Sequence, residues 1–212
     1  MNSKKLTGLA AIAGLFFLGT ASAQITNTAH DLRGEIAGLT DICIVCHAAH
    51  NNQNAQNELL WNHDPTTQTF IPYSSPTLDG ASAGPGATSL LCMGCHDGVV
   101  ALDAYGGTGT ITEGPLTGNV AFSSDLSDDH PVGVTYDPAA DAELQPIDNP
   151  VNFGPAGNTT VGTVAQMLQA GAVECASCHD VHATLSGGTG GNGNLLTVNN
   201  AGSDLCFACH DK

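Results

Sequence analysis

CIVCHAAH, residues 43–50, holds two cysteines separated by two residues and followed directly by a histidine. The same CxxCH pattern occurs three more times, as Cys92-Met93-Gly94-Cys95-His96, Cys175-Ala176-Ser177-Cys178-His179 and Cys206-Phe207-Ala208-Cys209-His210. All eight cysteines of the 212-residue chain lie in these four motifs. A single CxxCH arises easily by accident, but four copies that use every cysteine predict the chemistry of the whole chain.

The motif brings two sulfurs and one imidazole to the same helical turn. The sulfurs are spaced to bond the two vinyl groups of a haem, and the adjacent histidine then points at the iron. Structural zinc, the alternative, needs four ligands but no histidine after each CxxC. We therefore predict four covalently attached haem c groups. The cysteines predicted to attach them are Cys43, Cys46, Cys92, Cys95, Cys175, Cys178, Cys206 and Cys209, and the first iron ligands are His47, His96, His179 and His210.

The composition leaves little with which to build an ordinary hydrophobic core. The chain has 26 glycines, 5% aromatic residues and 11% charged residues. Haems would then supply much of the apolar interior, and folding would depend on their attachment. The fold class predicted is a multihaem c-type cytochrome, mostly coil with a few short helices and minimal strand, in which the haems form the core.

Local patterns predict a few regular elements. We expect a helical turn at each CxxCH, a helix over about residues 161–174, a strand at 132–136 and a short hairpin around residues 110–112. The helix is predicted because Val164, Met167, Leu168 and Ala172 share one face. Aromatic residues are expected to pack against haem: Trp61, Phe70, Tyr73, Phe122, Phe153 and Phe207.

The N-terminal segment predicts export. Lys4 and Lys5 precede an apolar run, and Ala21-Ser22-Ala23 ends it with small residues, the pattern of a secretory signal peptide over residues 1–23. Cleavage there leaves residues 24–212 as the tetrahaem domain, with Arg33 and Lys212 against 20 acidic residues and a formal charge of −18. Such an acidic chain is not expected to bind nucleic acid, because phosphates need clustered cations.

The four motifs alternate in their extensions. The first and third continue as CxxCHxxH, which adds His50 and His182, whereas the second and fourth continue with aspartate. This alternation indicates an internal two-haem repeat, over about residues 24–135 and 136–212.

The histidine supply matches four irons with two imidazoles each. Of nine histidines, five lie outside the motifs: His30, His50, His63, His130 and His182. Four are needed as second ligands, so one is spare. Two imidazoles on every iron imply low reduction potentials and leave no position for a substrate, so the chain is predicted to be an electron carrier and not an enzyme.

The two CxxCHxxH extensions limit which iron each extra histidine can reach. His50 leaves the chain three residues after His47, on the same side of the first haem, and cannot cross the ring to become its second ligand. The same holds for His182 and His179. Each must serve a different iron or remain a surface residue.

These motifs, together with His30-Asp31-Leu32, Leu60-Trp61-Asn62-His63 and residues 128–133, resemble the OmcE-type tetrahaem cytochromes, doubled-CxxCH multihaem proteins that polymerise into extracellular filaments. The resemblance implies that His50 ligates the iron of His210 in a neighbouring subunit. Applied to the repeat, it implies that His182 ligates the iron of His96 within the chain. His130 is then expected at the iron of His179, and His30, in preference to His63, at that of His47.

Three functions follow as alternatives. The first is a subunit of an extracellular filament that carries electrons to external acceptors and exchanges them with redox partner proteins. The second is a monomeric periplasmic shuttle with all eight ligands in one chain. The third is a multihaem oxyanion reductase, which needs an exchangeable iron position and cations to hold its anion. The expected location is outside the cytoplasm, at the cell surface or in the periplasm.

Overall fold

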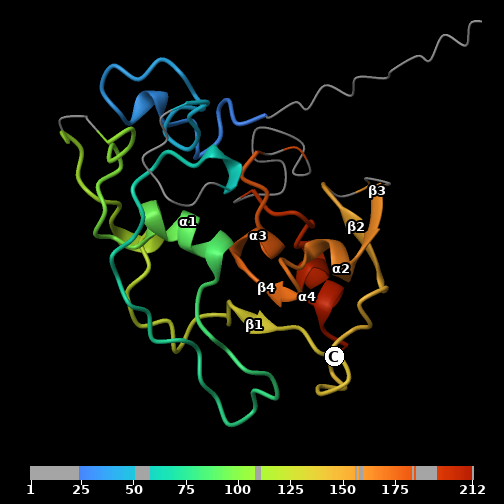
Figure 1. Ribbon diagram of the computed structural model, residues 1–212. Helices are drawn as coiled ribbons and strands as arrows, with labels where there is room; N and C mark the ends of the chain where they lie inside the picture. Colours follow the sequence, from blue (N-terminus) through green and yellow to red (C-terminus); the bar gives the residue numbers. More distant parts are fainter. Residues whose placement is uncertain are drawn as a thin grey trace, which may run out of the picture.

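The structure is a computed structural model that describes residues 24–50, 58–107, 111–155, 157, 160–182, 184 and 195–211. Its helices are α1 (Ala87–His96), α2 (Val164–Met167), α3 (Cys175–Cys178) and α4 (Asp204–Cys209). Short 3-10 turns lie at Leu32–Gly34, Glu58–Leu60, Gly118–Val120 and Ala201–Ser203. Figure 1 shows that long stretches of coil connect these elements. The prediction of a few short helices within mostly coil is confirmed.

The strands of the described residues form two antiparallel pairs. Strand β1 (Val134–Thr135) pairs with β4 (Ala172–Val173), and β2 (Pro150–Phe153) pairs with β3 (Thr160–Thr163). The strand predicted at 132–136 is present as the shorter β1. The hairpin predicted around 110–112 lies partly outside the described residues, and residues 111 and 112 are not in a strand. The predicted signal peptide, residues 1–23, also lies outside them.

The prediction of a helix over residues 161–174 is wrong for most of that range. Its start belongs to β3, because pairing with β2 takes up the β-branched residues around Gly162. Helix α2 begins only after Thr163, which forms a capping box with Gln166. It ends at Met167, and the positive φ angles of Ala170 and Gly171, 51° and 83°, then turn the chain into β4.

Two small apolar clusters form the hydrophobic core of the described residues. One contains Ile36, Val45 and Leu102 and lies in the first half of the chain. The other lies in the second half and contains Tyr136, Val151, Phe153, Val164, Met167, Val198 and Ala208. Phe153 therefore packs within protein, whereas Phe122 and Phe207 are exposed. Trp61, Phe70 and Tyr73 are half-buried.

Helices α1 and α3 join the two halves. They contact each other near the middle of the molecule, with α2, α4 and the β2–β3 pair on the side of α3 away from α1 (Figure 1). Helix α1 contains the second CxxCH motif and α3 contains the cysteines of the third, so the contact brings these two motifs together. No helix among the described residues is long and apolar enough to cross a membrane.

Candidate functional site

Each CxxCH motif forms one helical turn, as predicted. The backbone N–H of the histidine donates to the carbonyl of the first cysteine in three of them: His47 to Cys43 at 2.8 Å, His179 to Cys175 at 3.0 Å and His210 to Cys206 at 2.9 Å. His96 ends α1, which includes the whole second motif. In a helical turn, residues three and four apart lie on the same face, so both cysteines and the histidine of each motif are placed to reach one haem.

Backbone carbonyls orient two of the motif histidines. His47 Nδ1 lies 2.6 Å from the carbonyl oxygen of Leu59, and His96 Nδ1 lies 2.6 Å from that of Val120. A carbonyl accepts only, so these nitrogens donate. Each hydrogen bond fixes a tautomer whose Nε2 has a free lone pair, which is the form that ligates metals.

Six histidines from distant parts of the chain form three ring pairs, one stacked and two edge-on. The ring centroids of His47 and His182 lie 6.0 Å apart with the rings at 16° to each other. Those of His30 and His96 are 6.1 Å apart at 60°, and those of His130 and His210 are 6.5 Å apart at 74°. Every pair joins one motif histidine to one histidine from outside the motifs.

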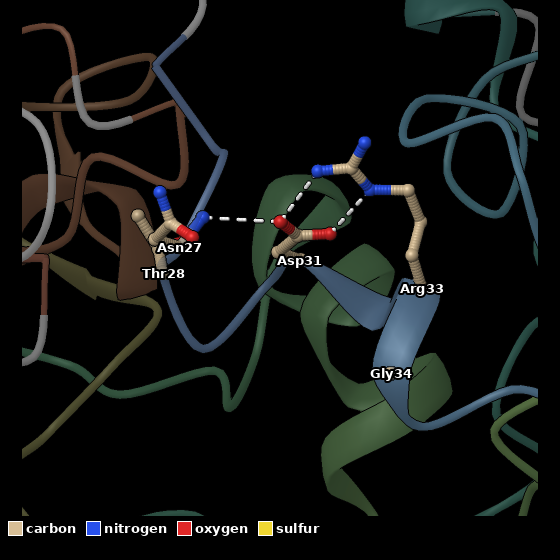
Figure 2. A pocket seen from close by; sticks show the side chains of 5 residues that line it. All are labelled: Asn27, Thr28, Asp31, Arg33 and Gly34. Carbon is tan, nitrogen blue, oxygen red and sulfur yellow. Dashed lines mark hydrogen bonds and ion pairs between the residues drawn. The ribbon is translucent and has the colours of Figure 1, made fainter.

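Local hydrogen bonds hold His30 in place. Its backbone N–H donates to Thr28 Oγ1 at 3.2 Å, and the carboxylate of Asp31 accepts from the backbone of Asn27 and from Arg33 (Figure 2). The Arg33 side chain holds the pKa of Asp31 well below its usual range. Burial, and then the proximity of His96, His179 and His182, lower the pKa of His30 to about 4. His30 is thus a neutral imidazole at pH 7, as ligation requires.

The separations of the ring centroids match those of two imidazoles on one metal ion. Metal to imidazole bonds are about 2.0 Å long and each centroid lies about 1 Å behind its nitrogen, so centroids across a metal are about 6 Å apart. Buried polar atoms beside the pairs also fit a haem. Trp61 Nε1 and His30 Nδ1 have no hydrogen-bond partner in the described part of the chain, and Trp61 contacts the His47 ring. Haem carboxylates could accept from both.

These pairings differ from those predicted. The ring of His182 contacts that of His47, the ring of His30 contacts that of His96, and the ring of His130 contacts that of His210. Which iron each of these histidines ligates stays a prediction. The predicted assignments came from the resemblance and from the repeat, whereas ring contacts depend on the path of the loops between the motifs.

His63 and His50 have opposite environments. His63 is fully buried, with Nδ1 3.0 Å from the carbonyl of Asp64 and Nε2 3.3 Å from that of Leu102. His50 is exposed. Because both nitrogens of His63 face carbonyls, it is the better candidate for the spare histidine.

Cysteines of consecutive motifs lie close together, so the four motifs are arranged in space in the order of the sequence. The pairs are Cys46 with Cys95, Cys92 with Cys175, and Cys178 with Cys209. Burial raises the pKa of the Cys95 thiol to about 12, and the nearby Cys46 contributes. The cysteines of consecutive motifs are thus close enough to influence one another along the whole series.

A buried carboxylate between the second and third motifs was missed at the sequence level. Glu174 is 6% exposed and accepts hydrogen bonds from Ser89, which is fully buried, and from the backbone of Gly86. These partners lie 85 and 88 residues away, so no local pattern could have indicated them.

Residues 167–212 match the family described as the doubled CXXCH motif. The matched segment contains the third and fourth motifs and covers less than half of the chain. No curated protein matches the chain. The match indicates a multihaem c-type cytochrome that binds haem covalently and transfers electrons.

Proposed function

We propose that this chain carries electrons through four covalently attached haem c groups, each ligated by two histidines, as the subunit of an extracellular filament. The observation that carries the proposal is the set of three histidine pairs with ring centroids 6.0–6.5 Å apart. In it, His47 and His182 hold the first iron, His96 and His30 the second, and His210 and His130 the fourth. Haem iron supplies the one-electron exchange.

The three pairs follow a regular rule along the repeat. Each histidine that precedes a pair of motifs contacts the histidine of the second motif of that pair: His30 precedes the first and second motifs and contacts His96, and His130 precedes the third and fourth motifs and contacts His210. The extension of the third motif, His182, faces the first histidine of the preceding half, His47. One application of the rule remains. His50 is the extension of the first motif. By the same rule it should face the first motif histidine of the half that comes before its own, and that histidine is His179.

His50 lies in the first half of its own chain, so a half that comes before it can belong only to another copy of the chain. Within the described residues His50 is exposed and makes no ring contact or hydrogen bond. We therefore assign the iron of His179 in a neighbouring subunit, in place of that of His210, as the partner of His50. Repeated from subunit to subunit, a heterologous contact of this kind generates an open filament.

A filament explains why the haems would follow one another from end to end. The cysteines of consecutive motifs are neighbours, so electrons can pass from the first haem to the fourth and then into the next subunit. The haems also supply the interior that the two small apolar clusters do not. Export past the cytoplasm and a place at the cell surface complete the proposal. A monomeric periplasmic shuttle, in which His50 serves its own chain, is the alternative.

The reductase alternative has less support. It needs an iron with an exchangeable position and cations beside it, whereas residues 24–212 contain one arginine and one lysine. The arginine, Arg33, is bound to Asp31 at 2.7 Å (Figure 2). A site for an oxyanion would lack the charges that such sites use.

Spectroscopy of the purified protein tests the proposal. We expect four covalent haems per chain, all low-spin in the oxidised and the reduced protein, because two imidazoles give each iron a strong ligand field. The haem count comes from mass spectrometry, and the spin state from electron paramagnetic resonance (EPR) and optical spectra. Carbon monoxide binding to the native reduced protein at about one haem per chain would instead favour the reductase.

A pair of variants tests which histidine is spare. His30→Ala removes the ring that faces His96, and we expect one high-spin haem per chain. His63→Gln keeps a buried hydrogen-bond donor near the Leu102 carbonyl, and we expect four low-spin haems with at most ~1–3 kcal/mol less stability from imperfect pairing. The opposite result would mean that His63 is the ligand and His30 the spare residue.

A further inference from the structure

Glu174 lies where the two halves of the chain meet. It is the N-cap of α3, which contains the cysteines of the third motif, and its carboxylate reaches α1, which contains the second motif. The contact of α1 with α3 is therefore built around one acidic side chain that is 6% exposed. A carboxylate with so little exposure needs hydrogen-bond donors, because burying an unpaired charge is costly.

Donors from both helices surround this carboxylate. Ser89 Oγ, from the first turns of α1, makes a short hydrogen bond to Glu174 Oε2, and the backbone N–H of Gly86 donates to the same oxygen at 3.1 Å. Glu174 also forms a capping box with Ser177 in α3. A Cβ at Gly86 would collide with the Glu174 carboxylate, so the glycine allows this close approach.

Ser89 extends the network to the haem attachment residues. Its Oγ accepts from the backbone N–H of Cys175 at 2.9 Å, so one hydroxyl bridges the carboxylate and the first cysteine of the third motif. Cys92 and Cys175 are themselves neighbours. The network thus fixes the first cysteine of the second motif against the first cysteine of the third.

We propose that Glu174 is a positioning residue for electron transfer, which holds the second and third haems at a fixed separation and lowers the reduction potentials of both. The inference rests on the proposed haem function. Its physical basis is twofold. The hydrogen bonds remove freedom between the two attachment sites, and a buried negative charge disfavours adding an electron to a nearby iron.

Three variants separate the geometry from the charge. Glu174→Gln keeps the shape of the side chain and removes the charge. Ser89→Ala keeps the charge and removes the hydroxyl that joins Glu174 to Cys175. Glu35→Gln removes an exposed carboxylate from the first half and is the matched control. Each protein is purified with its haems, and mass spectrometry confirms four per chain before any other measurement.

Two measurements follow on each protein. Redox titration monitored by EPR gives the four potentials, and circular dichroism in the Soret band reports coupling between adjacent haems. We expect Glu174→Gln to shift two of the four potentials upward and leave the other two unchanged. We expect Ser89→Ala to lose Soret coupling intensity. Glu35→Gln should match the wild type in both.

The outcomes are distinguishable. Four haems with unchanged potentials in Glu174→Gln and unchanged coupling in Ser89→Ala would overturn the inference and leave Glu174 as a helix cap only. If Glu174→Gln fails to load its haems, the coupling in Ser89→Ala decides. A wild-type chain with fewer than four haems would contradict the proposed function itself, whatever the variants show.

Discussion

His50→Ala is expected to convert filaments into soluble chains that carry four haems, one of which is high-spin. If His50 supplies a ligand to the His179 iron of a neighbour, each interface contains an iron to nitrogen bond that surface contacts cannot replace. Assembly and ligation then become one event, and removing the imidazole abolishes both. Electron microscopy of the purified protein reports assembly, and EPR reports the spin state.

Two other variants sharpen this test. His63→Gln is the matched control and should leave both the filament and the four low-spin haems intact. His130→Ala removes the ring that faces His210 and should give one high-spin haem without disassembly. That result would show that His50 ligates the iron of His179 and not that of His210, because only the iron that His50 ligates connects two subunits.

Mixing gives an independent measurement. A His50→Ala chain still presents the His179 iron to a wild-type neighbour but offers no imidazole of its own, so it should end filament growth. Increasing its share in a mixture should shorten the filaments progressively. A wild-type protein that is monomeric and fully low-spin at high dilution would favour the shuttle and contradict ligation between subunits.

The local parts of the site could be predicted from the sequence. A CxxCH motif forms its turn through a hydrogen bond from the histidine to the first cysteine, so spacing alone gives the geometry. The high glycine content likewise predicts few and short elements. The exception is the segment at residues 161–174, where an apolar pattern of helical period was overridden by pairing of β3 with β2.

The histidine pairs could not be predicted in the same way. His30 and His96 are 66 residues apart in numbering, and whether their rings face each other depends on every loop between them. The repeat indicated that the two halves share a plan but not which ring faces which. Contacts such as Ser89 with Glu174 have no sequence signal at all, because serine and glutamate are common in unrelated roles.

A chain produced without haem is expected to lose nearly all of its stability. Residues 24–212 made in the cytoplasm, away from haem attachment, should show no cooperative thermal transition by circular dichroism. The loaded protein should unfold with the ~5–15 kcal/mol typical of folded domains. Two-stranded sheets and helices of ten residues or fewer are not stable alone in water. The described apolar clusters are small, so little else offsets the conformational entropy.

A protein that lacks only one of its haems provides a graded version of the same experiment. Replacing Cys43 and Cys46 with alanine removes only the first attachment site, which borders the cluster of Ile36, Val45 and Leu102. Amide hydrogen exchange should then increase around that cluster and much less around the one that contains Val164 and Met167. Equal exchange rates in the two proteins, or a cooperative transition in the haem-free chain, would mean that the polypeptide supplies its own core. The two apolar clusters would then determine the fold, and the haems would occupy a structure that exists without them.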